Sequence, residues 1–330
     1  MSSPFATILP RPDRHREVSP DEALALVAGG ACVLDVRSQA ACAEEGRVPG
    51  ALVLPMDRLA SAPAVVAADG RPILVVGDGV RSRRAAVFLA EAGVAGVRHL
   101  AGGMAVWPGP RDHAPVAPAG PSPWFLENAR LAPRGARTLD VACGRGRHAL
   151  VLAQAGSFVR AVDPDASRVE TLRAVARRLH LPLTAEVVDL DAPGLSLGEE
   201  AHDLVLAFDG VRRAVFPALV RALAPGGLLL CETVAGGPAD GSDSEPLAPG
   251  ELRRLVEPLA VAGYRESAEG GRHLAAVAAR KPFRPSRTSA QSQAAATTRV
   301  AAAPATQRRP ARSRASSASG PARTPGARKR

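Results

Sequence analysis

A pair of glycines between two acids is the part of this sequence best suited to chemistry. Gly144 and Gly146 follow an apolar, β-prone run that begins at Thr138, and a helix-like run follows them. A strand that turns on glycines into the start of a helix lets a nucleotide approach backbone N–H groups. Asp163 ends the next strand-like run, where a carboxylate can accept hydrogen bonds from ribose hydroxyls. The spacing therefore predicts a nucleotide cofactor together with a strand–helix–strand unit.

The glycines alone leave two cofactors open. Gly144, Gly146 and Ala149 also fit the dinucleotide fingerprint, whose last position tolerates alanine. Asp140 favours a different ligand, because a carboxylate inside the strand end can receive a cationic amino-acid group, directly or through water. S-adenosylmethionine (SAM) carries such a group and NAD does not. We therefore expect SAM and keep an NAD-dependent enzyme as the weaker alternative.

Five segments in order extend this pattern to a known family. They cover residues 139–148, 161–163, 187–190, 203–209 and 223–233. Through them the chain from about 124 to 282 resembles the class I SAM-dependent methyltransferases, in particular the small bacterial enzymes related to tellurite-resistance and thiopurine methyltransferases. The resemblance implies SAM as the cofactor and an α/β fold with a Rossmann-like sheet, mostly parallel with an antiparallel last strand. Ala142, where many members have glycine, and residues 234–246, which fit no substrate-binding pattern, depart from the family.

The resemblance also implies a role for each site residue. Asp163 would hold the ribose, and Leu190 the adenine. Asp189 is expected beside the adenine as well, although the neighbouring Asp191 competes for that role. Phe208 and Asp209, at the tip of the fourth strand, would face the methyl group, with Asp209 as the candidate catalytic base. The residues expected at the methionine end of SAM are Asp140, Ala142, Cys143, Gly144 and Gly146.

Side chains next to these motifs bear on the methyl acceptor. His148, directly after the glycine motif, fits a capping or surface position better than a catalytic one. Arg212 and Arg213 closely follow Asp209 and are placed to steer an anionic substrate. The strand tip at 207–210 lacks the Asn-Pro-Pro-Tyr-like motif typical of amino-group methylation of DNA or protein. We therefore expect a small-molecule acceptor.

The first hundred residues alternate strand-like and helix-like runs, which predicts a small parallel sheet. Ser19 and Glu22 form a capping box that should start a helix. Four segments in order, 34–37, 48–51, 79–82 and 100–107, make residues 17–110 resemble a rhodanese-like domain. Sulfur transfer in that family passes through a persulfide on a loop cysteine, and Val76 stands in its position. We therefore expect no sulfurtransferase activity and a binding or regulatory role instead.

Three arginines beside this loop leave two interpretations open. Arg81, Arg83 and Arg84 begin the helix that follows the loop. Their guanidinium groups and the backbone N–H groups there could hold an anion. A solvated helix face is the alternative, and it is the one we favour.

Charge and composition divide the chain of 330 residues. The formal net charge is +10, but residues 283–330 contain eleven Arg or Lys and no acid, which leaves 31 basic against 32 acidic residues elsewhere. This segment has hardly any large apolar residue, so we expect a disordered tail, with weak attraction to nucleic acid or an acidic surface as an open function. The predicted organisation is an extension at 1–16, the rhodanese-like domain at 17–110, a Pro- and Ala-rich linker at 111–123, the methyltransferase domain at 124–282 and the tail at 283–330.

The four cysteines form no C-x-x-C pair, and residues 1–18 contain no apolar signal-peptide run. Free thiols in a reducing cytoplasm are therefore expected. No apolar run approaches the length of a membrane span, and no metal site is expected. The leading interpretation is a SAM-dependent methyltransferase with an inactive rhodanese-like domain. A non-enzymatic sensor or scaffold that binds SAM or an anion is the alternative.

Overall fold

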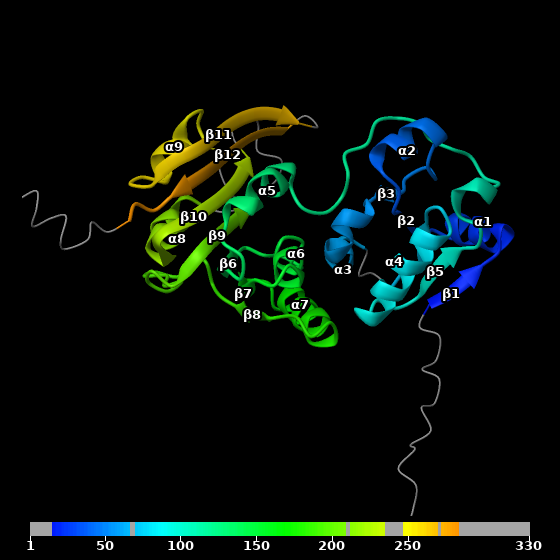
Figure 1. Ribbon diagram of the computed structural model, residues 1–330, viewed down its shortest axis with the longest axis horizontal. Coiled ribbons are helices and arrows are strands. Elements are labelled where there is room, and N and C mark those ends of the chain that lie inside the picture. The colour runs from blue at the N-terminus through cyan, green and yellow to red at the C-terminus, as the bar shows by residue number, and fades with distance from the viewer. Residues whose placement is uncertain (1–14, 67–69, 209–211, 235–246, 270–271, 284–330) are drawn as a thin grey trace, which may run out of the picture. The chain divides into compact units, whose positions relative to one another are not determined.

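The computed structural model describes residues 15–66, 70–208, 212–234, 247–269 and 272–283. Within these residues the chain forms two α/β domains, each built on its own sheet (Figure 1). The first sheet has five parallel strands in the order β1-β5-β4-β2-β3. Its strands are β1 His15–Val18, β2 Cys32–Asp35, β3 Leu52–Val53, β4 Ile73–Val76 and β5 Val97–Leu100. The small parallel sheet expected from the sequence is thus present. Its first strand, β1, begins at His15, two residues before the predicted start of the domain at residue 17.

Helices cover both faces of the first sheet. α1 Pro20–Ala28 begins at the predicted capping box, where the Ser19 hydroxyl accepts the Glu22 N–H and the Glu22 carboxylate accepts the Ser19 N–H. α4 Val80–Glu91 packs on the opposite face from α1. α2 Gln39–Glu45 and α3 Ala62–Val65, which the sequence pattern does not predict, lie in the connections before and after β3.

The connection that leaves the first domain is held to that domain by hydrogen bonds. The Arg47 guanidinium donates to the carbonyl of Ala114 at 2.6 Å. Further along, the N–H of Ala119 donates to the carbonyl of Val53 at 2.7 Å. The predicted linker is therefore a strap, residues 111–119, that follows the surface of the first domain before the second domain begins.

The second sheet has seven strands in the order β11-β12-β10-β9-β6-β7-β8. β8, β7, β6, β9 and β10 are parallel, and β12 runs antiparallel between β10 and β11. This is the predicted Rossmann-like arrangement, and the prediction is confirmed. The strands are β6 Arg137–Val141, β7 Phe158–Asp163, β8 Leu183–Val187, β9 His202–Phe208, β10 Leu223–Val234, β11 Ala260–Glu269 and β12 Arg272–Arg280.

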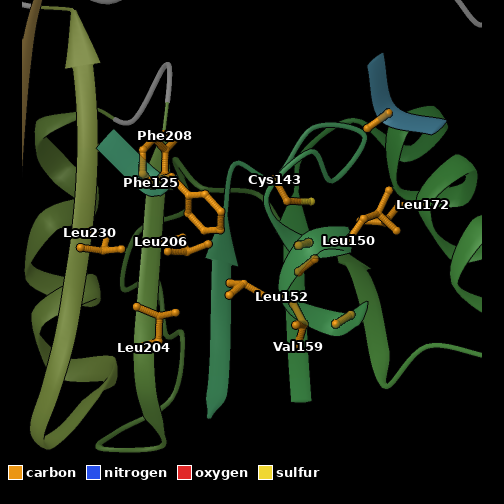
Figure 2. Packing of buried hydrophobic residues seen from close by; sticks show 14 of the residues in the cluster. Phe125, Cys143, Leu150, Leu152, Val159, Leu172, Leu204, Leu206, Phe208 and Leu230 are labelled. Atoms are coloured by element: carbon orange, nitrogen blue, oxygen red, sulfur yellow. The ribbon is translucent and has the colours of Figure 1, made fainter. Parts of the chain in front are cut away.

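Alternate residues of the central strands build two cores. Leu204 and Leu206 of β9 face α5, α6 and α7, whereas Val205 and Ala207 face α8 and α9. Figure 2 shows the first core, with the side chains of α6 and α7 packed beside the strands. The helices are α5 Pro123–Asn128, α6 Ala149–Gln154, α7 Ala166–Arg178, α8 Phe216–Ala222 and α9 Glu251–Leu255. Short 3-10 helices cover Met56–Ser61, Gly103–Val106, Ala129–Leu131 and Arg213–Val215.

The start of β10 is irregular and α9 is short. β10 begins at Leu223, because the chain pairs there with His202 of β9 before its register shifts. α9 covers only Glu251–Leu255. The Phe283 ring is 78% exposed and lies over Gly226, where a Cβ would be 2.4 Å from it. The remainder of the predicted tail, 284–330, lies outside the described residues.

Candidate cofactor site

The turn after β6 is built from residues in the left-handed conformation. Ala142, Gly144 and Gly146 have φ values of +56°, +56° and +85°. Side chains rarely adopt this conformation, which explains why glycine is common at position 142 in the family that the sequence resembles. A Cβ on Gly146 would lie 2.5 Å from Cδ1 of the buried Leu172, whereas a Cβ on Gly144 would meet nothing within 4 Å. Gly146 is therefore needed for packing, and Gly144 leaves open space beside the backbone.

The Asp163 carboxylate ties this turn to the end of β7. Its Oδ2 accepts the Gly144 N–H at 2.7 Å, and its Oδ1 accepts the Asp165 N–H at 3.0 Å. The residue is 2% exposed. Each carboxylate oxygen has a second acceptor site, so Asp163 can still bind a hydroxyl donor from a ligand.

A cavity of about 530 Å³ lies at the carboxyl edge of β9, β6, β7 and β8. Open parallel sheets bind ligands at this edge, and the volume falls within the range of small-molecule sites. Neighbouring strands are about 4.8 Å apart, so the ends of β9 and β8 are separated by about 14 Å across the cavity. The wall consists of Ala64, Ala142, Cys143, Gly144, Arg145, Arg147, His148, Asp163, Pro164, Arg168, Leu190, Asp191, Phe208, Arg212 and Val215.

Six of the predicted cofactor residues line this cavity: Ala142, Cys143, Gly144, Asp163, Leu190 and Phe208. Gly146 packs behind the turn. Within the described part of the chain, Asp140 and Asp189 do not belong to the cavity wall. Asp191 takes the place beside Leu190, and the Asp189 carboxylate accepts the Asp191 N–H at 2.9 Å. The predicted base, Asp209, lies outside the described residues.

Asp140 is buried behind the glycine turn. It is 1% exposed, and its Oδ2 has no hydrogen-bond partner. Burial raises the pKa of this carboxyl to about 7, and the positive charge of Arg147 opposes part of that rise. A cation placed near the turn would therefore stabilise the ionised form of Asp140.

His148 is buried, contrary to the capping or surface position expected from the sequence. It is 3% exposed, and its side chain makes no cap hydrogen bond although it stands at the start of α6. Its Nε2 accepts the Ser122 N–H at 3.2 Å. The ring packs 4.2 Å from the centroid of Phe208 and 4.8 Å from that of Phe125. The sequence gives no direct signal of this cluster, because its members come from three separate segments.

Four arginines give the cavity wall a positive character. Arg145 donates to the carbonyl of Val66 at 3.0 Å, and Arg147 lies near Asp140. Arg168, on α7, was not predicted as a site residue, and it pairs with Asp165 at 3.2 Å. Arg212 pairs with Asp191 at 2.9 Å. The cavity wall therefore carries four guanidinium groups but only two carboxylates, those of Asp163 and Asp191.

The loop between β4 and α4 contains no nucleophile. Val76, at the end of β4, is fully buried. The Asp78 carboxylate accepts the Arg81 N–H at 2.7 Å and lies 3.5 Å from the Arg81 Nε. The Asp78 carboxylate thus already accepts a backbone N–H at the start of α4, where a bound anion would have to lie. This contact argues against the interpretation of the loop as an anion site.

Family comparisons agree with this geometry. Residues 138–227 match the family model of a methyltransferase domain, and residues 19–109 match that of a rhodanese-like domain. The chain therefore joins a rhodanese-like domain to a methyltransferase domain. Both resemblances inferred from the sequence are confirmed.

Curated relatives match only part of the chain. Demethylmenaquinone methyltransferase of Clavibacter sepedonicus is 36% identical over 117 residues, which are 33% of this chain and 46% of the relative. Hemagglutinin 1 of Eikenella corrodens is 41% identical over 71 residues, 22% of this chain and 23% of the relative. The chain thus spans less than half the length of either relative. Among solved structures, TehB from Haemophilus influenzae has a TM-score of 0.41 and 19% identity, over 48% of this chain and 61% of that one.

The described residues contain neither a membrane-spanning helix nor a cluster of metal-binding side chains. None of the helices there is long and apolar enough to span a membrane. No group of three or more His, Cys, Asp or Glu side chains is placed to hold a metal ion in that part of the chain. None of the four cysteines, which all lie among the described residues, forms a disulfide; all are buried, and burial raises the pKa of Cys42 to about 11.

Proposed function

We propose that the methyltransferase domain transfers a methyl group from SAM to a small-molecule acceptor. SAM is the cofactor that a methyltransferase domain of this fold indicates. The observation that carries the proposal is the Asp163–Gly144 contact at the edge of the 530 Å³ cavity. It fixes an acceptor for ribose hydroxyls next to a glycine with open space above its backbone.

The residues present fit this cofactor. The unpartnered Oδ2 of the buried Asp140 matches a cationic amino group nearby, directly or through water. Leu190, or Asp191 beside it, would hold the adenine, and Asp163 the ribose. Phe208 lines the cavity at the end of β9, three strands away from β8, which leaves that end of the cavity for the reacting groups. The cofactor would supply an electrophilic methyl group on a good leaving group, so the protein has mainly to align the acceptor and exclude water.

An anionic acceptor fits the wall best. Arg212 comes four residues after Phe208 in the sequence and lines the cavity, where it pairs with Asp191 at 2.9 Å. Arg145, Arg147 and Arg168 line the same wall. Guanidinium groups bind carboxylates and other oxyanions through paired donors. We keep Asp209 as the candidate base for an acceptor that is protonated at neutral pH.

We further propose that the rhodanese-like domain does not transfer sulfur. Val76 replaces the cysteine that would carry the persulfide, and the Asp78 carboxylate lies against the start of α4. A binding or regulatory role remains for this domain. A reducing compartment such as the cytoplasm remains our expectation for its location, since no disulfide joins the four cysteines, all of which are described.

Turnover separates the enzyme from a scaffold that only binds SAM. The purified chain is incubated with SAM and the low-molecular-mass fraction of an extract of its own cells, and S-adenosylhomocysteine (SAH) is quantified by mass spectrometry. We expect SAH to form with the wild type and not with Asp163→Ala. SAM binding without SAH formation in any fraction would favour the scaffold. Thiosulfate and cyanide are added in a parallel reaction, in which thiocyanate formation would contradict the second proposal.

A further inference from the structure

His148 is a buried polar side chain on the cavity wall with no assigned role. Its Nε2 accepts the N–H of Ser122, so this nitrogen carries no proton and the ring is neutral. Burial lowers the pKa of the imidazole well below its usual range, and the nearby positive charge of Arg147 acts in the same direction. The neutral form is therefore the resting form at physiological pH.

The ring connects the start of α5 to the end of β9. On one side it holds the backbone of Ser122, the residue that caps α5. On the other it stacks against Phe208, with 35° between the rings, and Phe125 of α5 closes the cluster at 6.1 Å from Phe208. Figure 2 shows Phe125 and Phe208 beside each other at the upper end of the strands. One imidazole on the cavity wall thus contacts both the start of α5 and Phe208, the tip of β9 that also lines the cavity.

Ser122 is also where the strap reaches the second domain. Its preceding residues are bonded to the first domain, as the Ala119 N–H to Val53 contact at 2.7 Å illustrates. The hydrogen bond to His148 fixes the chain again three residues later. Without it, the segment that leads into α5 would lose this contact with His148, a residue of the cavity wall.

We propose that His148 is a positioning residue for methyl transfer: as a neutral acceptor it holds Ser122 and, by stacking, sets Phe208 at the end of the cavity away from Leu190. This inference rests on the proposed function, because it assigns that end to the methionine and methyl part of SAM. His148 should therefore affect the binding affinity of a ligand that reaches Phe208, and not that of a ligand that occupies only the adenosine end.

Two ligands and matched variants test the claim by calorimetric titration of the full chain. SAH carries an amino-acid arm that would reach the Phe208 end of the cavity, whereas adenosine lacks this arm. His148→Phe keeps an aromatic ring but removes the acceptor, and we expect it to weaken SAH binding about 3- to 10-fold with adenosine binding unchanged. His148→Gln supplies an acceptor again and should restore part of the SAH affinity. If His148 had only a structural role, the variant would weaken the binding of SAH and of adenosine by the same factor. That result would overturn the proposal.

The Ser122 side of the bond gives an independent control. Ser122→Ala removes only the hydroxyl that accepts the Phe125 N–H, whereas Ser122→Pro also removes the N–H donated to His148. Proline is compatible with the backbone here, since φ of Ser122 is −55°. We expect Ser122→Pro to weaken SAH binding as His148→Phe does, and Ser122→Ala to do so less.

The outcomes separate the two proposals. Wild-type chain that binds neither SAH nor adenosine would overturn the proposed function and this inference with it. Wild-type binding of SAH that His148→Phe leaves intact would overturn the inference alone. Hydrogen exchange of the Ser122 amide in the ligand-free protein should be faster in His148→Phe, and unchanged exchange would also contradict the proposed bond.

Discussion

Alanine at Gly144 and at Gly146 should have opposite consequences for folding and binding. Both residues adopt a left-handed conformation, which costs alanine about 1–2 kcal/mol. At Gly144 a Cβ has open space. Alanine also lowers the conformational entropy of the unfolded chain, which stabilises the folded state by about 0.4–1 kcal/mol. At Gly146 the Cβ would clash with buried Leu172 at 2.5 Å, and overpacking adds about 1–3 kcal/mol.

With the same unfolded-state contribution, Gly146→Ala should therefore lose about 1–5 kcal/mol of stability, which lowers Tm by on the order of 10 °C, while Gly144→Ala should lose about 1.5 kcal/mol or less. The order reverses for ligand binding. The Cβ at Gly144 would occupy space that a nucleotide needs next to the backbone, so SAH affinity should fall by at least about tenfold.

Thermal melts and calorimetric titration of both variants measure these two effects. Ala142 offers a matched comparison, because Ala142→Gly relieves the same backbone conformation and should change stability by about 1 kcal/mol at most. A Gly144→Ala variant that melts as early as Gly146→Ala, or that binds SAH like the wild type, would refute the geometry assigned to this turn.

Three other predictions concern buried ionisable groups. Asp35→Asn should destabilise the first domain by about 3 kcal/mol, measured by urea unfolding, because it removes the buried carboxylate 2.6 Å from the Arg37 guanidinium, which then keeps only the exposed Glu45 carboxylate. A disulfide reagent such as dithionitrobenzoate should react with all four thiols only after unfolding, because they are buried and the pKa of Cys42 is raised to about 11. Asp140→Asn should stabilise the ligand-free protein at pH 8 and not near pH 4, measured by thermal melts. The native pKa of Asp140 is raised to about 7 from 3.8, so the folded state binds its proton more tightly and loses stability as pH rises between these values.

Each of these predictions has a contradicting result. Wild-type stability in Asp35→Asn would mean that the ion pair is not buried in solution. Rapid reaction of a thiol in the native chain would contradict the burial of the cysteines. A stability difference between wild type and Asp140→Asn that does not change with pH would contradict the raised pKa of Asp140.

Local signals in the sequence predicted most of the fold. The glycine motif, the capping box at Ser19 and the alternation of strand-like and helix-like runs depend on neighbouring residues, and the structure contains the corresponding elements. Elements without such a signal, α2 and α3, were not predicted. The strap was predicted as a plain linker because its composition is rich in Pro and Ala, whereas its order comes from Arg47, far away in the chain.

In the candidate site, too, the sequence predicts what depends on local motifs and not what depends on loop paths or on contacts between distant segments. The sequence places Gly144 and Asp163 near each other because strand ends in a parallel sheet meet at one edge, and in the structure a 2.7 Å hydrogen bond joins them. The choice between Asp189 and Asp191 depended on the path of a short loop after β8, which periodicity does not determine. His148 was placed at the surface because its polar ring follows a motif, but Phe125 and Phe208 surround it from separate segments.

The measurement that tests the central claim most directly is calorimetric titration of the purified full-length chain with SAM, SAH and NAD, with Asp163→Ala as the control. We predict binding of SAM and SAH in the micromolar range, lost in the variant, and no binding of NAD. Absence of binding by both adenosyl ligands would contradict the methyltransferase account, and binding of NAD alone would identify the cavity as a dinucleotide site.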